Sequence, residues 1–392
     1  MRQATSTGHF FQTDAEQAQT ERRATKASNN NGNPVVLKSK LLAATPDPSA
    51  PSSLLIAEST GSVRRIDVDS GETKHVFKGP SAPVTCVAVG GPGNRTVFAG
   101  SWDKDIWSWD LKTKAPGRKY SGHTDFVKAI TCAKIGSKDC LISGGADKKI
   151  IVWDIETGSR IHTIQDQTIS MMALQALVVD PLESTPEVIV LVSASSDPHI
   201  RRWRITASTV EQIKEAEPSE PNAVRHSILE HETTVYKLFF DTEGEDVDLW
   251  TASGDGTTKC LSRQKGFTAD DIIKHGDHVR AVAVTDQWIV TAGRDEDIKV
   301  WDRTSGKLYC TLDGHYNEVT DLVMLPEGNR VASVSIDGTV RTWLLHKTEL
   351  DRINKEKDEK VNVVVKEAPA QTGEGLMTLE EEAELAALME ED

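Results

Sequence analysis

Short apolar runs of four to six residues, separated by polar turns, recur along most of the chain between residues 35 and 346. The stretch 122–155 shows the pattern most clearly, with apolar runs at 127–132 and 150–153 and turns that contain Gly and Asp. Runs of this length, rich in Ile and Val and bounded by Gly and Asp, are typical of short strands. The sequence therefore predicts an all-β fold built from a repeated unit of short strands.

Polar positions at fixed spacing mark the repeated unit. In the stretch 122–155, a hydroxyl side chain lies four residues before an Asp, and that Asp lies six residues before a Trp. A His lies near the start of the stretch. This spacing predicts a hydrogen-bonded chain of four side chains that pins the turn between two inner strands to the incoming loop. The Asp-to-Trp spacing recurs in five of seven units, and three units carry the full set. The predicted tetrads are His123, Ser143, Asp147 and Trp153; His275, Thr291, Asp295 and Trp301; His315, Ser333, Asp337 and Trp343.

The repeat length, the Gly-His pair at its start and the Trp-Asp pair at its end resemble the WD40 repeat. The resemblance implies a seven-bladed WD40 β-propeller over residues 35–346, in which four blades lack one or more tetrad members. The ring must close, because open first and last blades would leave unpaired strand edges. We predict that a β-branched run at 361–365 supplies the closing strand, without a strand borrowed from the N-terminal segment.

The two ends of the chain differ from the repeats in composition. Residues 1–34 are rich in Gln, Thr, Ala and Asn, and we expect this segment to be disordered. Residues 367–392 form an acidic tail, and the part from 373 onward contains eight acidic and no basic residues. A capping box at 378–381 and apolar residues at helical spacing predict a short helix in this tail. The tail fits either a solvated acidic segment or a docking motif for a basic partner.

Charge and cysteine content narrow the classes of partner and compartment. The net charge is −15, of which residues 1–34 carry +1 and residues 347–392 carry −8, so the repeats themselves carry −8. A chain this acidic repels a phosphate backbone, and we expect no direct nucleic-acid binding. No apolar run approaches the roughly 20 residues of a membrane span. The five cysteines include no C-x-x-C pair, which favours free thiols in the cytoplasm, the nucleus or both.

Catalytic and cofactor motifs are missing from the sequence. It contains no H-E-x-x-H, G-x-S-x-G, P-loop or strand-following G-x-G-x-x-G motif, so we expect no enzyme, metal or cofactor site. A propeller enzyme that uses the central channel is the less favoured hypothesis. Two arginine clusters, at 64–65 and 201–204, fit either phosphoinositide binding or a basic position of the repeat, and the repeat pattern favours the second.

The family resemblance implies that the protein has a binding role. Such propellers are rigid platforms that bind peptides or domains on the top face, which is built by the tetrad turns and by the loops that enter the innermost strands. Aromatic residues and Arg at these positions are the best candidates, since Trp, Tyr and Arg dominate interface energies. The candidate partner-binding residues are Trp102, Phe126, Lys128, Tyr236, Arg280, Arg294 and Ile336.

Two binding hypotheses remain open. One is an interaction scaffold for other proteins or peptides. The other is a specificity or assembly subunit of a larger complex, such as a ubiquitin ligase, a ribosome-biogenesis factor or an RNA-processing factor. In both cases we expect a monomer within a larger complex.

Overall fold

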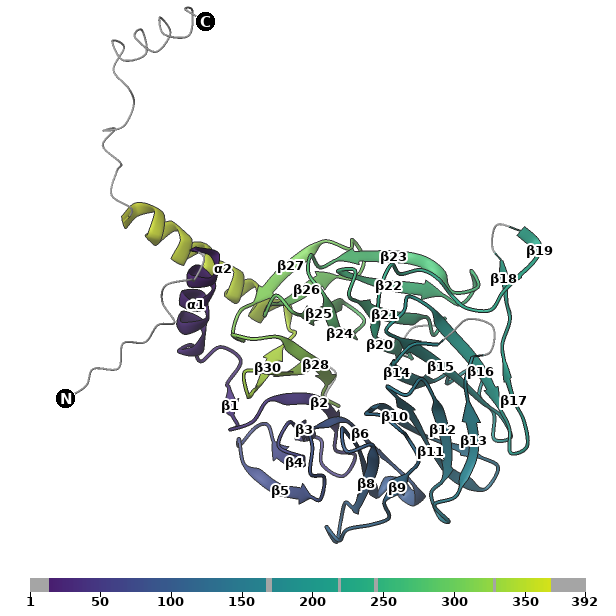
Figure 1. Cartoon of the computed structure of the whole chain (residues 1–392). Helices are drawn as coiled ribbons and strands as arrows, with labels where there is room; N and C mark the ends of the chain where they lie inside the picture. The colour runs from purple at the N-terminus through teal and green to yellow at the C-terminus, as the bar shows by residue number, and fades with distance from the viewer. Residues whose placement is uncertain (1–13, 167–170, 218–219, 243–245, 327–328, 368–392) are drawn as a thin grey trace, which may run out of the picture. The chain divides into compact units, whose positions relative to one another are not determined.

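The computed structural model describes residues 14–166, 171–217, 220–242, 246–326 and 329–367. Contacts divide the chain into two units, residues 1–347 and residues 348–392. The first unit contains seven four-stranded antiparallel sheets arranged around a common axis (Figure 1). This arrangement confirms the predicted all-β, seven-bladed propeller.

In blades one to six, chain order runs from the innermost to the outermost strand; in blade seven this holds for the first three strands. Blade one holds β2 (Leu41–Pro46), β3 (Ser53–Glu58), β4 (Ser62–Asp67) and β5 (Thr73–Lys78). Blade two holds β6 (Val84–Gly90), β7 (Thr96–Ser101), β8 (Asp105–Asp110) and β9 (Tyr120–Ser121), with a 3-10 turn at Pro92–Asn94. Blade three holds β10 (Val127–Ile135), β11 (Lys138–Gly145), β12 (Ile150–Asp154) and β13 (Arg160–Ile164).

The remaining blades repeat this order. Blade four holds β14 (Leu174–Val179), β15 (Ile189–Ser195), β16 (Ile200–Ile205) and β17 (Val210–Gln212). Blade five holds β20 (Val235–Phe240), β21 (Leu249–Ser253), β22 (Thr257–Ser262) and β23 (Thr268–Lys274). Blade six holds β24 (Val279–Val284), β25 (Trp288–Gly293), β26 (Ile298–Asp302) and β27 (Leu308–Leu312). Blade seven holds β28 (Val319–Met324), β29 (Arg330–Ser335), β30 (Thr339–Leu344) and β1 (Val35–Val36).

Hydrophobic contacts between neighbouring blades form the core. The second strand of each blade is buried on both faces, as in β3 and β15, where every residue is buried. One cluster joins Leu41 and Ile56 of blade one to Val334 and Val340 of blade seven. Because each sheet packs against the next around the ring, the blades form a rigid support for the loops at their ends.

The ring closes with the N-terminal strand β1, which pairs with β30 as the outer strand of blade seven. The prediction of a closing strand at 361–365 is therefore wrong, since the structure places those residues in the helix α2 (Lys347–Glu367). The flanking backbone extends the short β1 pairing. The amide of Leu37 donates to the carbonyl of Gly338 (2.7 Å), and the amide of Thr342 donates to the carbonyl of Gly32 (2.8 Å).

Specific contacts hold this closing segment in place and explain why it occupies the outer position. Gly32 adopts a φ of 70°, and a Cβ there would come within 2.8 Å of the Trp343 ring. The guanidinium of Arg341 donates to Asn29 Oδ1 (2.9 Å) and to the carbonyl of Asn31. The run at 361–365, by contrast, continues a Lys- and Glu-rich segment whose ion pairs at i,i+3 and i,i+4 spacing favour a helix.

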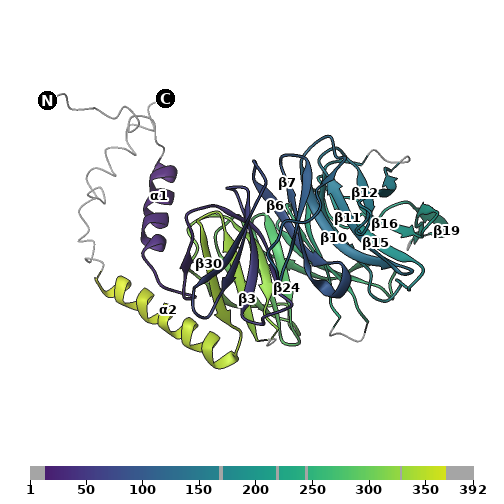
Figure 2. The same ribbon diagram turned by 90° about the horizontal axis from the view of Figure 1, so that it is seen from below.

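Within residues 1–34, where we predicted disorder, the described part from residue 14 onward contains a helix. The helix α1 (Asp14–Ala27) lies beside the blade that carries β30 (Figure 2). Lys26 is buried, and its Nζ pairs with Asp297 Oδ1 (2.6 Å) and Asp313 Oδ1 (3.0 Å). Arg23 pairs with the buried Glu296. Ion pairs with an acidic turn of blade six thus order a helix that has too few apolar residues to pack alone. Residues 1–13 lie outside the described residues.

Residues 206–222, which follow the third strand of blade four, contain β17, β18 (Glu215–Glu217) and the start of β19 (Glu220–Arg225). The strands β18 and β19 form a hairpin. The tail from residue 368 onward, with its predicted helix, lies outside the described residues.

Candidate functional site

Hydrogen bonds link the four predicted tetrad members of blade three. His123 Nδ1 lies 2.9 Å from Asp147 Oδ1, and His123 Nε2 lies 2.8 Å from Ser143 Oγ. The indole Nε1 of Trp153 donates to Ser143 Oγ (2.9 Å). The chain therefore runs from the turn through the incoming loop to the third strand. We call the face of the propeller that carries these turns the top face.

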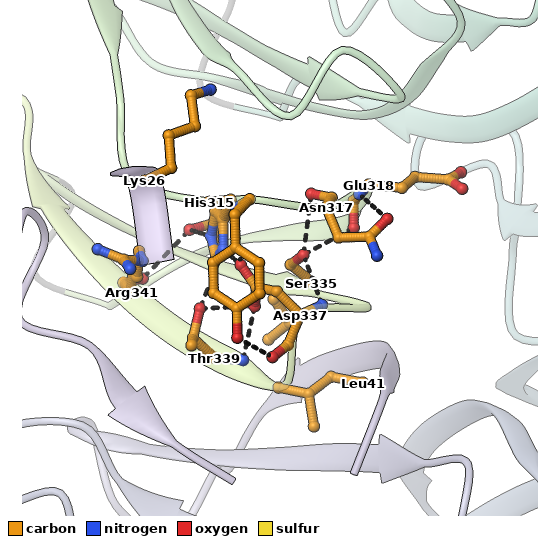
Figure 3. Close-up of polar contacts among 12 residues, drawn as sticks. Lys26, Leu41, His315, Asn317, Glu318, Ser335, Asp337, Thr339 and Arg341 are labelled. Carbon is orange, nitrogen blue, oxygen red and sulfur yellow. Dashed lines mark hydrogen bonds and ion pairs between the residues drawn. The ribbon is translucent and has the colours of Figure 1, made fainter. Parts of the chain in front are cut away.

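The tetrads of blades six and seven have the same connections. In blade six, the ring nitrogens of His275 lie 2.8 Å from Thr291 Oγ1 and 2.9 Å from Asp295 Oδ1, and Trp301 Nε1 donates to Thr291 Oγ1 (2.7 Å). In blade seven, His315 Nδ1 lies 2.9 Å from Asp337 Oδ2 (Figure 3). The other ring nitrogen of His315 lies 2.7 Å from Ser333 Oγ. Trp343 Nε1 donates to Ser333 Oγ (2.9 Å).

The tetrad carboxylates are ionised, and the tetrad side chains form hydrogen bonds with one another. Burial raises the pKa of Asp295, but hydrogen bonds and the charges of His275 and Lys299 outweigh it and bring the pKa to about 2. The pKa values of Asp147 and Asp337 are also lowered, for the same balance of reasons. These hydrogen bonds within each blade stabilise the turn.

Blade four lacks the tetrad His, and Arg201 makes polar contacts in its place. Its fully buried guanidinium donates to Asp166 Oδ2 (2.6 Å) and, through both terminal nitrogens, to Asp197 (3.2 Å each). Ser193 still accepts from Trp203 Nε1 (2.8 Å). A buried guanidinium between two carboxylates therefore takes the place of the tetrad imidazole.

The other arginines of the two clusters also have carboxylate partners. Arg202 donates to Glu215 Oε1 (2.9 Å), and Arg64 donates to Glu58 Oε1 (2.7 Å). Arg65 pairs with Asp47, and Arg204 pairs with Glu211. These partners favour the structural role of the clusters over a phosphoinositide site.

A cavity of about 370 Å³ lies between the innermost strands of the seven blades. In every innermost strand the pairing register skips the second residue, which is a β-bulge. A bulge leaves its extra residue unpaired and re-aims its side chain, and here the bulge residues all line the cavity. The seven bulge positions hold Leu42, Thr85, Lys128, Gln175, Tyr236, Arg280 and Thr320. We call this set the bulge ring.

Two cations and no acid occupy the bulge ring. The guanidinium carbon of Arg280 lies 4.1 Å from the centroid of the Tyr236 ring, and Arg280 Nε lies 3.0 Å from Glu318 Oε1. Lys128 is half-buried, and burial, followed by the charge of Arg280, lowers its pKa. Among the described residues no hydrogen bond or ion pair joins Lys128 to a partner.

An ion pair crosses the cavity one residue further along the innermost strands. Lys237 Nζ of blade five lies 2.7 Å from Asp321 Oδ1 of blade seven, past blade six. Asp321 also accepts from the amide of Ala44 (3.2 Å). The pair neutralises both charges, and Glu318 pairs with Arg280, so Lys128 is the cation of the bulge ring without a carboxylate partner among the described residues.

Two exposed aromatic rings lie beside the bulge ring. Trp102, in the tetrad turn of blade two, lines the cavity and stacks on Phe126, which precedes β10, with ring centroids 4.8 Å apart. Their exposed fractions are 40% and 37%, although large aromatic side chains are seldom left in water. Trp102 is therefore a partly exposed residue that packs on a neighbouring blade.

The structure brings together six of the seven candidate partner-binding residues. Trp102, Lys128, Tyr236, Arg280 and Ile336 line the cavity, and Phe126 joins them through its contact with Trp102. Arg294 is exposed in the turn of blade six and does not line the cavity. Reasoning from sequence missed Gln175, Lys237 and Asp321, although Gln175 occupies the same bulge position as Lys128.

Within the described ranges, no group of three or more His, Cys, Asp or Glu side chains is arranged to hold a metal ion. None of the described helices is both long enough and apolar enough to span a bilayer. All five cysteines are free thiols.

Comparisons with known proteins place these observations in context. A model of the WD domain, G-beta repeat, matches residues 71–110, 270–302 and 306–343, and a model of the tRNA methyltransferase TRM82 WD40 domain matches residues 120–241. An uncharacterized WD repeat-containing protein of Schizosaccharomyces pombe is 29% identical over 99% of both chains. Nuclear distribution protein PAC1 of Arthroderma otae is 28% identical over an alignment that covers 71% of this chain and 53% of that protein.

Proposed function

Because the chain belongs to the WD40-repeat family, we propose that it is a non-catalytic scaffold that binds protein partners through its top face. The observation that carries the proposal is the exposed Trp102–Phe126 stack beside the bulge ring. Aromatic anchors next to a cation are the kind of contact that dominates interface energies. A rigid ring of blades holds these side chains in place before a partner arrives, which lowers the ordering cost of binding.

The proposal of a non-catalytic role is supported by the state of the ionisable groups. The tetrad His and Asp side chains are buried in hydrogen bonds to one another. The acid that lines the cavity, Asp321, is paired with Lys237. A nucleophile with an adjacent general base, which covalent catalysis requires, is not assembled by the described cavity residues.

A second candidate is a specificity or assembly subunit of an RNA-modifying complex. The observation that favours it is the match of residues 120–241 to the tRNA methyltransferase TRM82 WD40 domain. In this role the chain would bind a catalytic protein rather than RNA, in keeping with its net charge of −15. We further propose that it acts in the cytoplasm, the nucleus or both, which the five free thiols support.

The test is affinity purification of the full chain from its native source, followed by quantitative mass spectrometry. The double variant Trp102→Ala/Phe126→Ala should lose its main partner, because two anchors of about 2 kcal/mol each amount to roughly a thousandfold in affinity. The matched control is Ile272→Ala/Leu308→Ala, which removes two exposed apolar residues from the outer strands β23 and β27.

The outcomes separate the proposals. Partners lost only from the Trp102→Ala/Phe126→Ala variant, with an unchanged thermal melt, support top-face binding. Partners retained by that variant contradict it. A methyltransferase chain among the lost partners supports the second candidate.

A further inference from the structure

The bulge ring differs in charge from the rest of the chain. The protein carries a net charge of −15, yet the ring contains Lys128 and Arg280 and no carboxylate. Arg280 already has an acid, Glu318, at 3.0 Å, and Lys237 has Asp321 at 2.7 Å. Lys128 is therefore the cavity cation that lacks a carboxylate within the described part of the chain.

An unpaired lysine in this position is unfavourable on its own. It is half-buried, and its pKa is lowered by burial first and by Arg280 second, so the charged form is disfavoured where it lies. A bound anion would relieve both effects. The bulge of β10 places the Lys128 side chain at the cavity.

The surroundings indicate which anion fits. Recognition of a phosphate usually employs several donors, such as Arg forks or backbone amides, whereas Lys acts as a single point charge. The arginine of the ring is already paired with Glu318. The Trp102–Phe126 stack adjoins the cavity and offers an apolar contact to a residue that flanks the anion. At about 370 Å³, the cavity is at the small end of ligand pockets.

We propose that the bulge ring binds an acidic side chain of a partner peptide, whose carboxylate pairs with Lys128 while a neighbouring large apolar residue packs on Trp102 and Phe126. The inference rests on the top-face binding proposed above and adds the chemistry of the ligand. Small residues next to the bulges, such as Ala129 and Ala176, leave room for the inserted side chain.

The probe is a set of immobilised heptapeptide pools in which the central residue is Glu, Gln or phosphoserine and the other positions are randomised. The full chain should bind the Glu pool about 10–100 times more tightly than the Gln pool, as expected for a charge-assisted hydrogen bond. Lys128→Gln should reduce binding of the Glu pool to the level of the Gln pool, and Lys128→Arg should restore most of it. Lys112→Gln is the matched control, because Lys112 is exposed in the turn after β8.

The possible results are distinguishable. If the Glu and Gln pools bind equally and the Trp102→Ala/Phe126→Ala variant binds neither, the proposal of an acidic ligand is wrong. Binding through the top face is still supported in that case. Preference for phosphoserine over Glu overturns the carboxylate in favour of a phosphopeptide. If the Glu pool binds only after residues 368–392 are removed, the occupant is the chain's own acidic tail and not a partner. Loss of the Glu preference in Lys128→Gln, with an unchanged thermal melt, supports the proposal.

Discussion

The tetrad hydrogen bond of Trp153 can be measured against a matched tryptophan that lacks one. Trp153 and Trp250 are both buried, with exposed fractions of 3% and 1%. Trp153 Nε1 donates to Ser143 Oγ (2.9 Å), whereas Trp250 Nε1 has no hydrogen-bond partner among the described residues. The change to Phe removes the N–H from both positions and a similar volume from both, so the cost of the cavity largely cancels in the comparison.

The expected difference follows from hydrogen-bond energetics. Trp153→Phe loses a buried bond worth about 0.5–1.5 kcal/mol, whereas Trp250→Phe removes a buried unpaired donor that costs about 1–3 kcal/mol. The two variants should therefore differ by roughly 1.5–4.5 kcal/mol, with Trp153→Phe the less stable. At about 2 °C per kcal/mol for a domain of this size, the thermal midpoints should differ by roughly 3–9 °C.

The assay is thermal unfolding of the full chain followed by circular dichroism, with both variants scanned at one rate because large domains often unfold irreversibly. Equal midpoints, or a lower midpoint for Trp250→Phe, would refute the claim that the tetrad bond stabilises blade three.

Three further predictions concern closure and pH. Deleting residues 1–37 should lower the thermal midpoint because it removes the closing strand, whereas deleting 368–392 should leave it unchanged; equal melts would show that closure does not depend on β1. Gly32→Ala should lower the stability of the fold more than Gly136→Ala, because both glycines have positive φ but only a Cβ at Gly32 meets an indole ring. Calorimetry compares the two variants, and equal losses of stability would contradict the contact with Trp343. The pKa of Asp295 is about 2 in the fold, so its ionised form stabilises the fold above about pH 4 and that contribution is lost as the pH falls toward 2. The midpoint gap between the parent chain and Asp295→Asn should therefore close over that window, and a constant gap would argue against it.

The blades could be predicted from the sequence because each one is specified locally. The hydroxyl, Asp and Trp of a tetrad lie within ten residues of one another, as Ser143 and Trp153 do, so their spacing is visible along the chain. Ring closure is not local. β1 is two residues long and pairs with β30, about 300 residues away, and its place depends on contacts of Arg341 with Asn29 and Asn31. The β-branched run at 361–365 gave a stronger local strand pattern than β1 did.

The candidate site could be predicted in part for the same reason. Lys128, Tyr236 and Arg280 occupy one repeat position, so the pattern placed them together. The bulge that turns this position toward the cavity has no signature of its own in the residue types. The Lys237–Asp321 pair joins blades five and seven, and no spacing along the chain indicates a contact across the axis.

Site-specific photo-cross-linking tests top-face binding most directly. A benzophenone side chain replaces Phe126 in one full-length chain and Leu308, which is exposed on the outer strand β27, in another. Irradiation in the native source should give a cross-linked protein partner from position 126 and none from position 308. Partners that cross-link from position 308 but not from position 126 would contradict the account.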